Sequence, residues 1–141
     1  MIDTSIHAEL LASYERASYH VEASPSFILK IGRYSPELHS MYEASSKKRA
    51  AFITAYNPGS IELSNEDNKE RNQRLEEKIQ TLLLDYIYGE STCDESEWTG
   101  EKSFLILGIK QEEAISLGKE FGQNAIVWIN QKAIPELLLL K

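Results

Sequence analysis

The sequence contains a single cysteine, Cys93, among its 141 residues. No intrachain disulfide can form, so the chain shows no sign of the oxidising compartments in which small domains depend on such bonds. The first seven residues have neither the basic start nor the apolar run of a secretory signal peptide. We therefore expect a cytoplasmic protein.

Long apolar runs are also missing. Stretches such as Phe104–Leu107 fall far short of the roughly 20 residues that a helix needs to cross a bilayer, so we expect no membrane association. The chain is nevertheless 42% hydrophobic, and its length suffices to bury one sizeable core. Since no internal repeat or flexible linker interrupts it, we predict a single domain over residues 1–141.

Basic residues are scarce relative to acidic ones: 15 Lys and Arg oppose 22 Asp and Glu, for a net charge of −7. Binding to nucleic acid requires clustered cations, and the short run 47–49 is a weak cluster, so nucleic acid is disfavoured as a partner. Six of the acids and no Lys or Arg lie between Asp85 and Glu101. We interpret this segment as a solvated negative loop, or alternatively as a surface for a basic protein partner.

Several catalytic signatures are absent: the phosphate-binding loop, the dinucleotide glycine fingerprint, the serine elbow and the paired-histidine zinc helix. His7, His20 and His39 are not at metal-ligand spacing, so the sequence predicts no metal site. Cys93 has acidic neighbours, which disfavour the nucleophilic thiolate. A catalytic cysteine or metal centre is therefore not expected.

Hydrophobic periodicity predicts alternating helices and strands. An N-terminal helix carries an apolar stripe between Ile6 and Ala17, which should dock on a sheet. Ser35 and Ser64 are typical of helix starts because a serine hydroxyl can accept from the first free amides, and the helix after Ser64 should run to about Asp85. The predicted strands are apolar runs bounded by turn residues, at 26–31, 50–56, 103–109 and 125–129.

The last third of the chain suggests how the sheet is connected. A strand at 103–109, a helix at 112–121 closed by Gly122 and a strand at 125–129 favour a right-handed parallel crossover. The final leucine run, 137–140, indicates a hairpin-like end. We therefore predict an α/β fold with a mixed sheet of four to five strands flanked by helices, with an α+β fold as the alternative.

Polar residues lie beside the predicted strands where packing alone does not require them. Amide side chains both donate and accept hydrogen bonds, so they suit a polar ligand, but they also form turns, and Asn57 before Pro58 fits both interpretations. Asn68 and Asn72 are one helical turn apart and form either a solvated face or part of a site. Trp98 could stack on a ligand or cover a core edge. The candidate ligand-binding residues are Thr54, Asn57, Asn68, Glu101, Gln123 and Asn124.

Four segments together resemble the family known as domain of unknown function 3293: Phe52–Pro58, Asn68, Trp98–Phe104 and Phe121–Ala125. The resemblance spans about residues 45–130, and the six candidate residues match positions typical of the family. It implies a small bacterial cytosolic protein. It carries over no activity, cofactor or catalytic residue.

Our hypothesis is a pocket for a polar small molecule such as a nucleotide. In an enzyme, Glu101 would be the general acid or base, which requires a partly buried carboxyl group. The alternative is an acidic protein-interaction module without catalytic activity. Thr54 and Asn57 follow the strand at 50–56, whereas Glu101 and Gln123 precede theirs, so a shared site requires this strand to run antiparallel to the other two.

Overall fold

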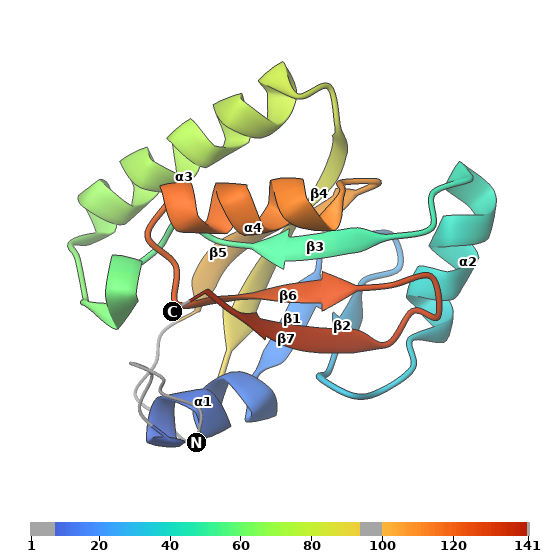
Figure 1. Ribbon diagram of the computed structural model, residues 1–141, viewed down its shortest axis with the longest axis horizontal. Coiled ribbons are helices and arrows are strands. Elements are labelled where there is room, and N and C mark those ends of the chain that lie inside the picture. Colours follow the sequence, from blue (N-terminus) through green and yellow to red (C-terminus); the bar gives the residue numbers. More distant parts are fainter. Residues whose placement is uncertain (1–7, 94–99, 141) are drawn as a thin grey trace.

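The computed structural model describes residues 8–93 and 100–140 (Figure 1). Seven strands form one sheet in the order β2-β1-β4-β5-β3-β6-β7. The strands are β1 (Ser18–Val21), β2 (Phe27–Leu29), β3 (Ala50–Ile53), β4 (Asp85–Thr92), β5 (Glu101–Leu107), β6 (Ala125–Ile129) and β7 (Pro135–Leu139). The helices are α1 (Ala8–Arg16), α2 (Pro36–Ser45), the 3-10 turn η1 (Pro58–Ser60), α3 (Asn65–Thr81) and α4 (Gln111–Glu120).

The combination of helices and strands is confirmed, but the predicted mixed sheet of four to five strands is wrong. The sheet has seven strands, and all of its described neighbouring pairs are antiparallel, as in the α+β alternative. β5 and β6 do point the same way, as a crossover through α4 requires. However, β3 is hydrogen-bonded between them, so these two strands are not neighbours.

The two strands that periodicity missed are β1 and β4. β1 begins directly after the short helix α1, where the sequence showed only the end of a helical stripe. β4 occupies the first half of the acidic segment, so the interpretation of 85–92 as a solvated loop is wrong. Its acidic residues belong to a strand that pairs with β1 on one side and β5 on the other. Pairing with these distant strands outweighed the local concentration of negative charge, so the segment forms a strand and not a loop.

The local helix signals are confirmed. The Ser35 and Ser64 hydroxyls accept from the amides of Leu38 and Asp67, each at 3.1 Å. α3 ends at Thr81, before the predicted Asp85, and Leu83 then adopts a left-handed conformation with φ 58°. The hairpin-like end is present as the antiparallel pair of β6 and β7. No described helix is long and apolar enough to cross a membrane.

Each face of the sheet has its own apolar core. α3 and α4 cover one face, where Leu75 and Leu117 pack in a cluster with Ile106. The opposite face holds Phe52 and packs against Leu38 of α2. Figure 1 shows α3 and α4 together on one side of the sheet, whereas α1 and α2 lie well apart on the other. This separation leaves part of the second face for the pocket described below.

Gly89 allows the Phe52 ring to lie across β4. A Cβ at this position would come within 2.6 Å of the His20 carbonyl oxygen and 2.7 Å of the Phe52 ring. The ring in turn contacts Tyr19 edge-on, with centroids 5.4 Å apart. The missing side chain of Gly89 therefore sets the position of two aromatic residues on this face.

We predict that Gly89→Ala destabilises the fold by about 3 kcal/mol, because backbone or ring must shift to admit the methyl group. β-Propensity alone predicts the opposite effect, a more stable variant, because glycine weakens a strand. Urea unfolding measures the loss. The control is Gly32→Ala, where φ is +81° but nothing lies within 4 Å, and we expect a loss of about 1 kcal/mol there. Equal losses in the two variants would contradict the steric explanation.

Candidate functional site

The sequence-predicted polar residues meet at one end of the sheet. β3 is antiparallel to both β5 and β6, so the residues that follow β3 lie beside those that begin β5 and β6. This is the strand direction that a shared site requires. As a consequence, four residues from distant parts of the chain meet at this edge, the end of the sheet where β3 stops: Thr54, Asn57, Glu101 and Gln123.

Asn57 is the centre of the hydrogen-bond network at this edge. Its Oδ1 accepts from Asn68 Nδ2 at 2.7 Å and from the Leu63 amide at 3.0 Å, while its Nδ2 donates to Glu101 Oε2 at 2.9 Å. The Asn57 amide also donates to Asn68 Oδ1 at 2.8 Å. Asn57 has φ 44° and ψ 63°, a left-handed conformation that asparagine tolerates better than most residues. One side chain thus joins the turn after β3, the start of α3 and the start of β5.

Further polar side chains hold the turn from α3 and from the residues before β6. Asn72 Oδ1 accepts from the Ala55 amide at 3.0 Å, and Arg71 Nε donates to the Ala55 carbonyl at 2.9 Å. Gln123 Nε2 donates to the Tyr56 carbonyl at 3.1 Å. Asn68 and Asn72 are only 3% and 8% exposed, so they do not form a solvated helix face. Most of these amides stabilise the turn itself.

A pocket of about 380 Å³ opens beside this network, on the face of the sheet that carries Phe52. Its walls come from α1, the turn after β3 and the strand ends. Four of the six candidate residues are among its lining: Thr54, Asn57, Glu101 and Gln123. Asn68 and Asn124 lie behind the lining. Asn68 holds Asn57, and Asn124 Nδ2 donates to the Ser60 hydroxyl at 2.9 Å.

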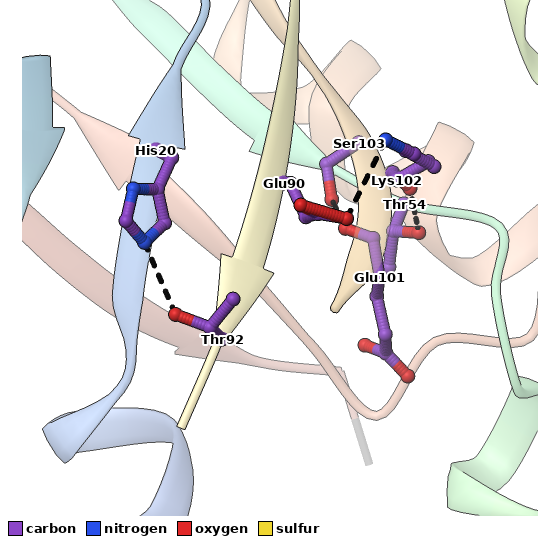
Figure 2. A network of polar contacts seen from close by, with 7 residues as sticks. All are labelled: His20, Thr54, Glu90, Thr92, Glu101, Lys102 and Ser103. Carbon is purple, nitrogen blue, oxygen red and sulfur yellow. Dashed lines mark hydrogen bonds and ion pairs between the residues drawn. The ribbon is translucent and has the colours of Figure 1, made fainter. Parts of the chain in front are cut away.

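The lining of the pocket combines apolar and polar side chains. Phe52, Val127 and Leu137 contribute apolar surface from the sheet, and serine, threonine and tyrosine residues contribute hydroxyl groups. Figure 2 shows the hydrogen bonds at the start of β5, with the Glu101 carboxylate pointing away from them, beyond the point where the strand begins. Glu101 is partly buried, as an acid–base role demands.

Tyr19 is buried within the pocket wall and donates to the Tyr14 carbonyl at 2.6 Å. Burial raises the pKa of the Tyr19 hydroxyl well above its usual range, and the neighbouring Tyr14 and Glu101 raise it further. The Tyr19 hydroxyl therefore stays protonated at any physiological pH and donates to the Tyr14 carbonyl. This bond also ties α1 to β1.

The charge of the pocket is negative. Glu62 and Glu101 are among its lining residues, whereas no Lys or Arg is found among those that the structure describes. The nearby Arg71 and Lys102 bind elsewhere: Arg71 to backbone carbonyls and Lys102 to Glu90 at 3.5 Å.

Sequence reasoning missed the pocket residues contributed by α1 and β1. Leu10 and Tyr14 belong to the apolar stripe that we expected to dock on the sheet, yet they line the pocket together with Tyr19. Ser103 follows Glu101 by two positions, and this strand alternation was the one available signal that both side chains share a face. Trp98 lies outside the described residues, and Cys93 is buried.

We predict that Asn57→Asp destabilises the protein at neutral pH by about 2 kcal/mol. The aspartate keeps the acceptor for Leu63 and Asn68 but places a carboxylate against Glu101 in place of a donor. Adding Glu101→Gln restores a donor–acceptor pair with the roles exchanged, so the double variant should recover most of the loss. Thermal and urea unfolding of the single and double variants measure this coupling.

Asn130→Asp is the matched control for this exchange. Asn130 Oδ1 likewise accepts from a backbone amide, that of Lys132 at 2.8 Å, and an aspartate there can keep that bond. We expect a stability change within about 0.5 kcal/mol. If Glu101→Gln fails to improve the Asn57→Asp variant, the Asn57–Glu101 bond does not hold this edge together.

Comparison with known proteins gives one result. The family described as "Protein of unknown function (DUF3293)" matches residues 53–126, which is more than half of the chain. The match runs from the end of β3 to the start of β6 and includes all six candidate residues, but not α1, β1 or β7. Searches of curated proteins and of solved structures found no match. The resemblance inferred from the sequence is confirmed, and the chain belongs to the DUF3293 family of proteins of unknown function.

Proposed function

We propose that this protein binds a polar small molecule in the pocket between α1, the turn after β3 and the strand ends. The observation that carries the proposal is a concave space of about 380 Å³ that combines apolar side chains with a partly buried carboxylate. Pockets of this size, mainly apolar and with a few oriented polar groups, are typical of small-molecule sites. Glu101 supplies the oriented group, because Asn57 holds one of its oxygens.

The lining argues against the nucleotide that the sequence suggested as a first ligand. Phosphate groups are bound by Lys, Arg or free backbone amides at a helix start. Among the described residues the lining offers no such cation, and it includes none of the first residues of α3. We therefore favour a ligand without phosphate groups.

If the bound molecule is a substrate, Glu101 is the group best placed to exchange a proton with it. Its carboxylate lies at the pocket wall, and Asn57 fixes its orientation. General acid–base chemistry needs such a positioned group within hydrogen-bonding reach of the ligand. Glu101 thus remains the candidate catalytic residue within the proposed site.

The alternative of an acidic interaction module has weaker support. Asp85 and Glu90 belong to β4, inside the sheet, and Glu90 is paired with Lys102. These two acids therefore do not belong to a free negative loop. The remaining acids of that segment, at 94–97, lie outside the described residues. Binding in the pocket is the function that the described geometry supports better.

We predict that a small-fragment library yields ligands whose binding is abolished by Ala125→Phe. Ala125 lies in the pocket lining, so a phenyl group there should fill the space while replacing no polar contact. Saturation-transfer NMR with the wild-type and variant proteins measures binding. Ala44→Phe is the control, because Ala44 is exposed on α2, away from the pocket. Fragments that bind all three proteins equally would contradict the assignment of the site.

A further inference from the structure

We propose that Ser91 selects the ligand of this pocket, and that its hydroxyl binds a hydroxyl or carboxamide group carried on an apolar body about one ring in size. This proposal rests on the proposed function and narrows it to one class of ligand. It follows from the direction of the Ser91 side chain, its burial and the hydrogen bonds of its hydroxyl.

The side chain of Ser91 points toward the pocket. Ser91 pairs with Tyr19 of β1 on one side and with Glu101 of β5 on the other, and all three residues line the pocket. The next residue of β4, Thr92, shares a hydrogen bond with His20 at 3.1 Å, and these two residues line a separate groove (Figure 2). Because side chains alternate between the faces of a strand, Ser91 faces the pocket and Thr92 faces away from it.

Ser91 is only 4% exposed, yet no hydrogen bond joins its hydroxyl to another described residue. Every fully enclosed side-chain oxygen or nitrogen of the described residues has a partner, so the Ser91 oxygen is open to the pocket and not sealed in the core. Ser103 offers a contrast on the same face. It is 2% exposed, and its hydroxyl donates to the Glu101 carbonyl at 2.9 Å. The Ser91 hydroxyl therefore depends on the occupant of the pocket for a partner.

This dependence makes Ser91 selective. A ligand that covers Ser91 removes solvent from its hydroxyl and must replace the hydrogen bonds that solvent makes. An apolar group there leaves the hydroxyl buried without a partner, which weakens binding by about tenfold. The hydroxyl of Tyr56 also has no bond to another described residue, but Tyr56 is partly exposed, so solvent can reach it beside a ligand. Ser91 lies deeper and discriminates more strongly.

The chemistry of a serine hydroxyl indicates which groups suit it. It has one proton to donate and lone pairs that accept, so a hydroxyl or carboxamide can bond with it whichever way its proton turns. An ammonium group has no acceptor for the serine proton. A carboxylate has no donor, and it would lie beside Glu101, the cross-strand neighbour of Ser91. A group that both donates and accepts is therefore the best match.

The sheet also places apolar surface at a set distance from Ser91. Gly89 lies two positions before Ser91 on the same face of β4, and the Phe52 ring lies 2.7 Å from where a Cβ of Gly89 would stand. Two residues span about 7 Å of strand. Phe52 lines the pocket as well, so a ligand that bonds with Ser91 can place an aliphatic or aromatic ring against Phe52 and remove it from water.

The test combines a change in the ligand with a change in the protein. Benzyl, phenethyl and cyclohexylmethyl compounds, each carrying a hydroxyl, carboxamide, carboxylate or methyl group, are titrated into ¹⁵N-labelled protein. We expect alcohols and amides to bind the wild type about tenfold more tightly than the methyl compounds, and carboxylates to bind more weakly than alcohols. Ser91→Ala should remove the tenfold preference. Ser40→Ala, an exposed change on α2, should retain it.

Thermal unfolding of the ligand-free variants checks that the Ser91 hydroxyl is not used by the fold itself. We expect the melting temperature of Ser91→Ala to stay within about 2 °C of the wild type. Ser103→Ala loses a hydrogen bond to the backbone and should melt about 4 °C lower. An equal decrease in both variants would show that the Ser91 hydroxyl is bonded within the protein, and the proposal would fall.

A preference for alcohols and amides that survives Ser91→Ala overturns the proposal, as does one that is lost equally in Ser40→Ala. Tighter binding of carboxylates, or no binding of any alcohol or amide at millimolar concentration, also overturns it. Failure of the pocket itself looks different. If screened fragments bind the wild type, fail to bind Ala125→Phe and keep their affinity in Ser91→Ala, the pocket stands and only the role of Ser91 falls.

Discussion

The side chain of Asn57 connects three segments that are distant in sequence: the turn after β3, the first turn of α3 and the start of β5. Its Oδ1 accepts two of these bonds and its Nδ2 donates the third, and no other uncharged side chain of similar length offers both an amide oxygen and an amide nitrogen. The left-handed backbone at Asn57 turns the chain sharply enough for η1 to follow. The edge of the pocket depends on this junction, because it sets where Glu101 points.

A second layer of polar contacts surrounds that junction and is directed at the backbone. Arg71 and Gln123 both bind carbonyl oxygens of the turn region, and Asn72 binds an amide there. Such groups are costly to bury without partners, so their mutual satisfaction allows an irregular turn to pack against α3 and α4. The turn that borders the pocket is therefore held by side chains of α3 and of the residues before β6.

The family match covers only part of the pocket. Residues 53–126 include the Asn57 junction and Glu101, whereas α1, Tyr19 and Leu137 lie outside the match yet complete the pocket. The match thus contains the polar edge, and the flanking elements supply much of the enclosing surface. Tyr14 links the two parts, since its hydroxyl shares a hydrogen bond with Ser60 of η1 at 2.9 Å.

Much of what the sequence predicted was local. The caps at Ser35 and Ser64, the strand at β6 and the turn at Asn57-Pro58 were recognisable because each depends on residues within a few positions of one another. β4 was missed for the opposite reason. Its residues look like a charged loop in isolation, and only pairing with β1 and β5 makes them a strand.

By itself the sequence determined which polar residues are candidates for a site, and it predicted the strand direction that would bring them together. It could not place β3 between β5 and β6, because the choice of strand neighbours depends on which apolar faces pack over the whole sheet. Tertiary structure alone decided that Asn68 holds Asn57 from behind the pocket lining and that α1 forms one wall. These are properties of contacts between distant segments, and no local pattern encodes them.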